Sequence, residues 1–416
     1  MRSKAWWPFE IPLILLPHMA VVIWPGWIWL TCTIFVLSMI LTHFLTRRAR
    51  VKVDPESTSM IPHVTAMRST NLLQTCICIL AYDFPSIFQS RFAKNAVFGS
   101  SLMEIGIGII IYTGGVVAGK LMSDRPIRAW PMFRITAVLI LLGLARIVVL
   151  WLMGARDSEY GFHWNSFFTI AFLGPLVYGL LMLHRLVFKN KHYWINKAAT
   201  LLMLLLYQLA LSFGGLQEYL LSENSRVTLF EQNKEGIFSM IGYLNIFVLA
   251  AYTGHWLMVR ETVDEGLAPF LVINIIFSLV PYGLMKIAGL EPSRRLANLS
   301  YVLWIHGFGS LHHLLGWLTL PKDKYAGMMP VHSEGFSSHQ LILFLMANLL
   351  TGLIKNVVDT RNATAEVALG WMFLYGVVLF LAAVGSSYLF RGDKDFSKIV
   401  SREKNTLKST KPIENV

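Results

Sequence analysis

The sequence predicts an all-α protein: a polytopic bundle of about 12–13 transmembrane helices joined by short loops. Of the 416 residues, 55% are hydrophobic and only 14% are charged, whereas a typical soluble domain carries about 25% charged residues. Apolar runs of about 20 residues, long enough to cross a bilayer, recur along the chain. The longest polar segments, 45–65 and the tail after Arg391, are too short to bury a core. We therefore predict a single transmembrane domain over 1–416.

The predicted spans are separated by local stop signals. A Pro-Gly pair at 25–26 makes a tight turn after the first span, a basic cluster at 47–52 ends the second, and Asp83-Phe84-Pro85 ends the third. In the fourth span, Gly115 and Gly119 allow close contact with another helix. The spans are 9–24, 27–44, 64–82, 102–119, 133–153, 166–186, 198–216, 237–257, 268–287, 298–318, 339–358 and 367–390.

Loop charges predict the orientation. The basic clusters after the second, fourth and sixth spans and the basic tail at 391–416 all fall on one side, which the positive-inside rule makes cytosolic. The anchor helices in 1–52 then begin on that side, and the flexible tail ends there. The mixed-charge loops lie on the other side, where we expect the functional face. The net charge of +12 follows from this topology and from anionic headgroups, so nucleic-acid binding is excluded.

Neither disulfides nor a metal site are indicated. The three cysteines, Cys32, Cys76 and Cys78, all lie in apolar stretches and are typical of small core residues. His306 and His313 share a face of the tenth span, but an iron site would need further histidine motifs on other helices. The sequence also lacks phosphate-binding loops and the nucleophile elbow of hydrolases.

We call each polar stretch between apolar spans a polar island. The first of them, 82–108, contains a candidate acid–base pair. Asp83 lies at the end of the third span, and Lys94 follows eleven residues later. A carboxylate at an apolar boundary is partly desolvated and therefore more basic, and a lysine can hold it ionised or stabilise a developing negative charge. Alternatively, Asp83 caps the next turn while Arg91 and Lys94 contact headgroups.

Two further islands offer groups for a polar substrate. Arg146 lies inside the fifth span, where a charge normally faces a partner or an aqueous cavity; Glu104, Glu159 or a bound phosphate would each suit it. Glu159, His163 and Asn165 provide acid–base groups and hydrogen-bond donors for a polyol. An aromatic segment at the membrane surface with a capping asparagine explains the second island as well.

Two more islands precede the eighth and tenth spans. Asn233 and Glu235 open the eighth span, where helix capping accounts for them as well as ligand binding does. Arg294 and Arg295 stand close before Asn298, and paired arginines are suited to clamp a phosphate. Ordinary charges at the start of a helix are the alternative.

Taken together, these islands resemble the glycosylphosphatidylinositol (GPI) inositol acyltransferase family, called PIG-W in animals. The matching stretches are DFPSIFQSRFAK (83–94), GSSLMEIGIG (99–108), GLAR (143–146), EYGFHWNSFFT (159–169), LYQLALSFGGLQEYLL (206–221), NKEGIFSMIGYL (233–244), RRLANLSYVLW (294–304) and FLMANLLTGLIKNVVDT (344–360). They occur in the family's order. The sequence differs from the family in one extra residue between Asp83 and Lys94, and in Glu104, where the family has aspartate.

The resemblance implies an O-acyltransferase of the endoplasmic reticulum membrane. Such an enzyme moves a palmitoyl-type chain from acyl-CoA, its co-substrate, to the inositol 2-hydroxyl of glucosaminyl-phosphatidylinositol, with a lumenal catalytic face, a cytosolic C-terminus and no permanently bound cofactor. The resemblance assigns Asp83 and Lys94 as the catalytic pair, and His163 is the second candidate base. The predicted substrate-binding residues are Arg91, Arg146, Glu159, Asn165, Asn233, Glu235, Arg294, Arg295, Asn298 and Asn348. A lipid transporter or scramblase, or a non-catalytic subunit of a lipid-processing complex, is the alternative function.

Overall fold

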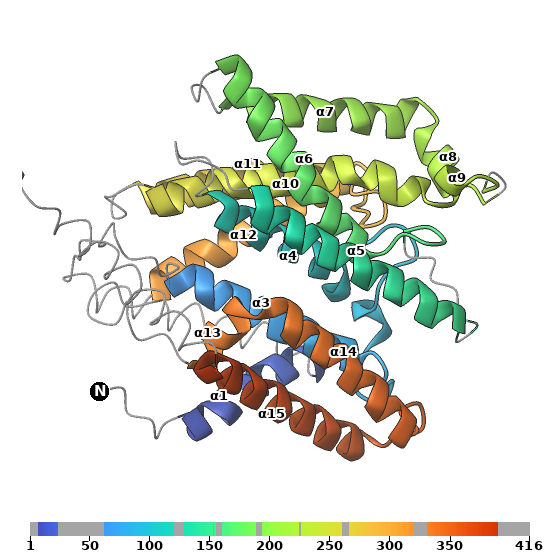
Figure 1. Ribbon diagram of the computed structural model, residues 1–416, viewed down its shortest axis with the longest axis vertical. Helices are drawn as coiled ribbons and strands as arrows, with labels where there is room; N and C mark the ends of the chain where they lie inside the picture. Colours follow the sequence, from blue (N-terminus) through green and yellow to red (C-terminus); the bar gives the residue numbers. More distant parts are fainter. Residues whose placement is uncertain are drawn as a thin grey trace, which may run out of the picture. The chain divides into compact units, whose positions relative to one another are not determined.

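The computed structural model describes residues 7–23, 62–119, 129–152, 154, 160–188, 194–223, 226–259, 266–319 and 331–389 (Figure 1). Throughout these ranges the regular structure is helical and no strand occurs, so the all-α prediction is confirmed. The predicted span 27–44, the candidate residue Glu159 and the basic tail 391–416 lie outside the described residues.

The helices follow the apolar stretches of the sequence. They are α1 (Trp7–Ile23), α3 (Pro62–Ala81), η2 (Ser90–Phe92), η3 (Leu102–Glu104), α4 (Ile105–Ala118), α5 (Ala129–Leu152), α6 (Ser166–Phe188), α7 (Trp194–Phe213), α8 (Leu216–Leu221), α9 (Leu229–Gln232), α10 (Lys234–Val259), α11 (Leu267–Ile287), α12 (Leu299–Thr319), α13 (Val331–Ser338), α14 (Gln340–Val357) and α15 (Ala365–Leu389). Among the described helices, seven are long and apolar enough to cross a membrane: α5, α6, α7, α10, α11, α14 and α15. The total of about twelve spans stays a prediction.

The chain divides into two compact units. The terminal unit contains Met1–Ile34, Arg68–Gln89 and Lys324–Val416, and the central unit contains Phe35–Met67 and Ser90–Asp323. In the terminal unit, α15 packs against α1, α13 and α14. The Tyr375 hydroxyl of α15 donates to the Cys76 carbonyl of α3 over 3.2 Å. Cys76 and Cys78 are both buried free thiols, which confirms them as core residues.

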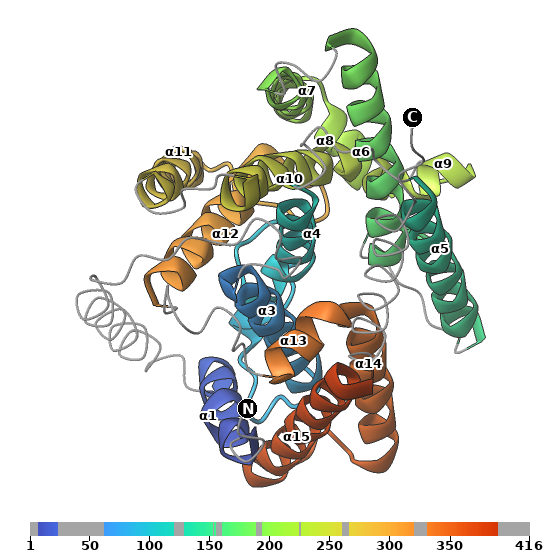
Figure 2. The ribbon, with the colours of Figure 1, turned by 60° about the vertical axis from the view of Figure 1, so that its left-hand side comes forward.

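The central unit is built around α10, which packs against α4, α6, α7 and α12 (Figure 2). Of the most apolar 18 residues of α10, 67% are buried inside the protein, whereas the corresponding share is 17% in α5 and in α11. The outer helices instead expose large apolar side chains, such as Trp151 and Phe277. Such faces suit contact with lipid, because an exposed apolar surface of this extent is unfavourable in water.

Glycines allow α4 and α10 to pack backbone against backbone. A Cβ atom on Gly115 would collide with the Phe247 carbonyl oxygen, and one on Gly254 would collide with the Val116 carbonyl oxygen. The close contact expected from Gly115 and Gly119 is therefore present, and α10 contributes a third small residue to it.

We expect Gly254→Ala to destabilise the protein by about 1–3 kcal/mol, because the added methyl group forces α4 and α10 apart. The thermal unfolding midpoint of the purified protein in detergent measures this effect. Gly283→Ala in α11 is the matched control, since a Cβ atom there meets nothing within 4 Å. Equal midpoints for the two variants would contradict the prediction.

Candidate functional site

Asp83 is placed by the end of α3. Its backbone N–H donates to the Leu80 carbonyl and that of Phe84 to the Ala81 carbonyl, so a tight turn follows the helix. The Phe84 side chain is fully buried and fixes this turn. One carboxylate oxygen of Asp83 lies 2.7 Å from the Lys355 ammonium, and the Asp83 side chain is only 9% exposed. The carboxylate is therefore largely buried and is held in place by a cation.

Lys355 was missed by the sequence analysis. It comes from the last turn of α14 and is the lone charged residue between Gln340 and Val357. A single cation at the end of an apolar helix is a signal, but it is shared by every lysine that extends toward headgroups. Only the fold shows that this lysine faces a carboxylate about 270 positions earlier in the chain.

Arg91 and Lys94 belong to the central unit, whereas Asp83 belongs to the terminal unit. Both side chains are exposed. The Arg91 guanidinium lies 5.1 Å from the ring centre of Phe92. The Asp83–Lys94 pair stays a prediction.

Three hydrogen bonds to backbone carbonyls join the segment after Lys94 to the loop that carries the paired arginines. Gly99 N–H donates to the Pro292 carbonyl over 2.8 Å. The Ser293 hydroxyl donates to the Val97 carbonyl over 2.7 Å, and the Arg295 guanidinium donates to the Ala96 carbonyl over 2.8 Å. Two islands almost 200 residues apart therefore form one piece of structure, and Lys94 is positioned relative to Arg294 and Arg295.

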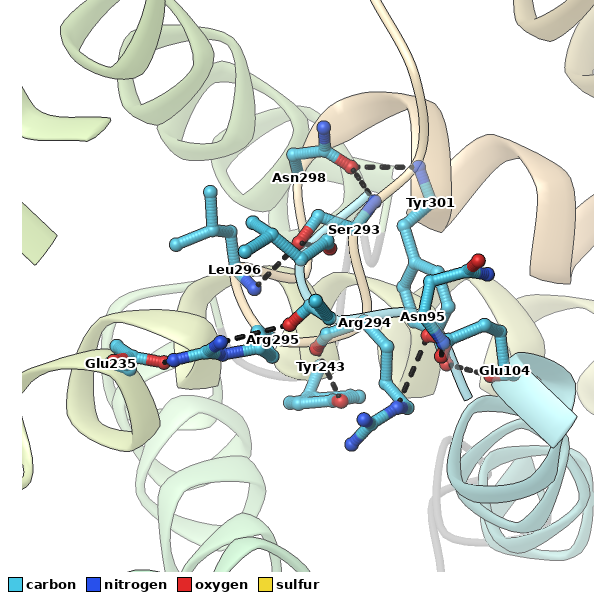
Figure 3. A network of polar contacts seen from close by, with 12 residues as sticks. Asn95, Glu104, Glu235, Tyr243, Ser293, Arg294, Arg295, Leu296, Asn298 and Tyr301 are labelled. Atoms are coloured by element: carbon cyan, nitrogen blue, oxygen red, sulfur yellow. Dashed lines mark hydrogen bonds and ion pairs between the residues drawn. The ribbon is translucent and has the colours of Figure 1, made fainter. Parts of the chain in front are cut away.

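Arg294 forms a buried ion pair with Glu104 (Figure 3). Its Nε lies 3.1 Å from a Glu104 oxygen, and both side chains are at most 4% exposed. The other Glu104 oxygen accepts the backbone N–H of Asn95 over 2.8 Å. The Tyr301 and Tyr243 hydroxyls donate to the backbone carbonyls of Glu104 and Arg294. Because its side chain is buried against Glu104, Arg294 holds the loop in place and has little surface for a ligand.

Arg295 shares a second carboxylate with Arg226. Glu235, at the start of α10, is fully buried and accepts from both guanidinium groups, with 2.7 Å to Arg295. The Arg295 side chain keeps 18% of its surface exposed. Of the two paired arginines, Arg295 is therefore the one with surface available to a ligand.

Two of the predicted asparagines, Asn298 and Asn165, form hydrogen bonds with backbone groups. The Asn298 amide accepts from Ser293 N–H and Tyr301 N–H and donates to the Glu291 carbonyl, which closes the arginine loop. Asn165 accepts from Phe167 N–H at the start of α6 and donates to the Gly143 carbonyl of α5.

Asn233 joins two more islands, because its amide oxygen accepts the backbone N–H of His163 over 3.1 Å and its nitrogen donates to Leu229. The His163 side chain itself is exposed. Asn348 is exposed on α14 and donates to the Phe344 carbonyl one turn earlier. Arg146 is half-buried on α5.

The central unit thus gathers four islands, 95–104, 160–165, 226–235 and 291–298, into one polar network. Among the described residues, the buried or half-buried cations of this network are Arg226, Lys234, Arg294 and Arg295, and its buried carboxylates are Glu104 and Glu235. The Lys234 ammonium lies 4.3 Å from the ring centre of Tyr219, and Arg294 lies 4.8 Å from that of Tyr160. Arg295, which keeps 18% of its side-chain surface exposed, suits contact with an anionic group such as a phosphate.

No cluster of three or more histidine, cysteine or carboxylate side chains suited to a metal ion occurs in the described part of the chain. His306 instead hydrogen-bonds Ser278 of the adjacent helix through Nδ1 over 2.9 Å. That the protein needs no metal stays a prediction.

Comparison with known proteins shows which family the chain belongs to. A family model described as GWT1 matches residues 6–386. The GPI-anchored wall transfer protein 1 of Gibberella zeae is 31% identical over 375 residues, 78% of this chain and 72% of that protein. The proteins of the same name from Emericella nidulans and Schizosaccharomyces pombe are 30% and 32% identical, over 83% and 76% of this chain and 79% and 70% of their own lengths. The resemblance read from the islands is confirmed, and the chain belongs to the GWT1 family.

Proposed function

We propose that this chain transfers a palmitoyl-type chain from acyl-CoA to the inositol 2-hydroxyl of glucosaminyl-phosphatidylinositol. Membership of the GWT1 family gives the general activity, an acyl transfer to inositol in GPI-anchor synthesis. The family match over residues 6–386 is the observation that carries the proposal. The acyl-CoA donor, the glucosaminyl lipid acceptor and the endoplasmic reticulum membrane, with a lumenal catalytic face, are the finer parts of the proposal.

Direct transfer from a thioester to an alcohol needs a base, an oxyanion stabiliser and two well-placed substrates. Asp83, which is ion-paired with Lys355, removes the proton of the inositol 2-hydroxyl. The inositol oxygen attacks the thioester carbonyl, and Lys94 stabilises the tetrahedral oxyanion. The carbon–sulfur bond then breaks, and the CoA sulfur leaves and takes up the proton from Asp83. The exposed His163 is the second candidate base.

The polar network supports recognition of the acceptor's phosphate. Glu104 and Arg294 are buried and hold the loop, whereas Arg295 and the exposed Lys94 have surface to offer. A phosphate binding there would bring the inositol close to Lys94, because the two segments are hydrogen-bonded to each other. Arg91 and Arg146 stay candidates for the phosphates of CoA.

We expect Arg295→Gln to raise the KM for the glucosaminyl lipid about tenfold with a smaller change in kcat, because a charge-assisted contact to phosphate is lost. Steady-state acylation at varied acceptor concentration measures this split. Arg295→Lys should recover part of the loss. Arg134→Gln, at an exposed arginine of α5, is the control; the same KM change there would point to general surface charge.

The proposed activity is tested in membranes that lack their own inositol acyltransferase. We expect the expressed chain, given labelled palmitoyl-CoA, to produce a lipid heavier by one palmitoyl group on inositol, as detected by mass spectrometry. If the chain inserts and accumulates yet forms no acylated lipid in membranes or in detergent, the enzymatic proposal fails. Movement of the lipid across the membrane without any product would instead favour the transporter alternative.

A further inference from the structure

The polar network contains a carboxylate that two arginines share. Glu235 lies in the first turn of α10 and is fully buried. Its Oε1 atom accepts from Arg226, and its Oε2 atom accepts from Nε of Arg295 over 2.7 Å (Figure 3). We call these three side chains the Arg–Glu–Arg triad. Because two guanidinium groups meet one carboxylate, and no other described carboxylate pairs with either arginine, the triad carries one positive charge.

Arg226 is held in place on both sides. The chain just after it is fixed by a capping box between Thr228 and Glu231 at the start of α9. The Arg226 guanidinium lies 5.4 Å from the ring centre of Phe162, within the range of a cation–π contact. The Arg226 side chain is only 9% exposed, and the hydrogen bonds that it donates to described residues all go to Glu235. Arg226 therefore directs its charge at Glu235 and offers little surface to a ligand.

Arg295 has hydrogen-bonding capacity left. A guanidinium group has five N–H donors. In Arg295, Nε donates to Glu235, Nη2 lies 2.7 Å from the same oxygen, and Nη1 donates to the Ala96 carbonyl over 2.8 Å. At least two of the five N–H groups therefore have no acceptor among the described residues, and the side chain is 18% exposed. Arg295 can contact an anion while Glu235 and Ala96 fix its orientation.

The charge of Arg295 is available to a ligand only if another cation neutralises Glu235. With Arg295 as its single partner, the buried carboxylate would cancel most of the guanidinium charge at short distance. We propose that Arg226 is a positioning residue for the acceptor: it neutralises Glu235, so that Arg295 keeps its charge for the phosphate of the lipid. This inference rests on the proposed function. The second arginine behind the phosphate contact is then Arg226, whereas the neighbouring Arg294 is paired with Glu104.

The charge and the surroundings of the triad favour the phosphate of a lipid over those of CoA. A phosphodiester carries one negative charge, which matches the one positive charge of the triad, whereas the phosphates of CoA carry several. Close after Arg226, the side chains of Val227, Leu229 and Phe230 are 83%, 72% and 50% exposed. Exposed apolar side chains beside a phosphate contact suit a lipid, because its acyl chains begin next to its phosphate.

Equilibrium binding of a fluorescent phosphatidylinositol to the full chain in mild detergent tests the proposal without turnover. We expect Arg226→Gln to weaken binding about tenfold, because the charge of Glu235 then opposes the phosphate, and Arg226→Lys to keep most of the affinity. The double variant Arg226→Gln/Glu235→Gln should regain most of the loss, since the opposing carboxylate is removed. Arg134→Gln, at an exposed arginine of α5, should bind as the wild type does.

A neutral ligand separates electrostatics from packing. The same lipid with a methyl phosphonate in place of its phosphodiester has no charge at this position. We expect the wild type and Arg226→Gln to bind it equally. In the acylation assay, Arg226→Gln should raise the KM for the glucosaminyl lipid about tenfold with little change in kcat, and it should leave the KM for palmitoyl-CoA unchanged.

Three results would overturn the role of Arg226. The first is wild-type binding of phosphatidylinositol by Arg226→Gln. The second is a loss that the double variant does not regain, or that extends to the neutral lipid; either would make Arg226 a packing residue or a direct contact. The third is a change confined to palmitoyl-CoA, which would assign the triad to the donor. Failure of the proposed function differs from all three, because the lipid would still bind through Arg226 while the wild type formed no acylated product.

Discussion

Asp83→Asn is expected to lower the acylation rate at least about 100-fold while the protein still folds, because general-base catalysis contributes about 10²–10⁴-fold. The amide keeps the shape of the side chain but cannot accept the inositol proton. The rate of product formation at saturating donor and acceptor measures the loss. An unchanged unfolding midpoint shows that the effect is chemical, and it is expected because the partner Lys355 has a side chain that is 51% exposed and can be solvated without Asp83.

Lys355 provides a second test of this assignment. Lys355→Met removes the cation 2.7 Å from the carboxylate and should reduce kcat by about tenfold with little change in KM, whereas Lys355→Arg should recover most of the rate. If Asp83→Asn retains activity and His163→Ala loses it, the base is His163. If Lys355→Met matches wild type, the ion pair serves only the packing of α14 against the end of α3.

The largest expected effect on stability concerns the ion pair between Glu104 and Arg294. Arg294→Met should destabilise the central unit by about 3–5 kcal/mol, because it removes the cation that is hydrogen-bonded to a buried carboxylate. The thermal unfolding midpoint in detergent, together with the fraction of protein that stays monodisperse, measures the loss.

The double variant Glu104→Gln/Arg294→Met separates lost pairing from lost packing. It should be more stable than Arg294→Met alone, because neither member of the pair is then left charged and unpaired. Additive effects of the two single variants would show that the two side chains do not depend on each other. Arg134→Met, at an exposed arginine, controls for the loss of a cation and should shift the midpoint little.

The sequence predicted the helices well because their signal is local. The predicted spans 166–186, 268–287 and 339–358 correspond to α6, α11 and α14 with shifts of one or two residues at most ends. An apolar run of sufficient length is helical in a membrane regardless of distant neighbours, since its backbone must satisfy its own hydrogen bonds. The same local reasoning identified Gly115 and Gly119 as a close-contact surface.

The islands were also recognisable, but not the role of each residue in them. Asn165, Asn233 and Asn298 were predicted as substrate contacts, and in the fold all three amides hydrogen-bond backbone groups. An asparagine that caps a helix and one that faces a sugar have the same sequence context. Whether they also contact substrate stays a prediction.

The sequence by itself determined the membrane class, the helix positions, the polar islands and the family, because composition, hydrophobic runs and motifs are properties of neighbouring residues. The tertiary structure alone decided which charges meet. It pairs Glu104 with Arg294, Glu235 with Arg226 and Arg295, and Asp83 with Lys355. Most of these partners are separated by 60 to about 270 positions. Electrostatic pairing depends on distance in space, and only the packing of the helices sets that distance.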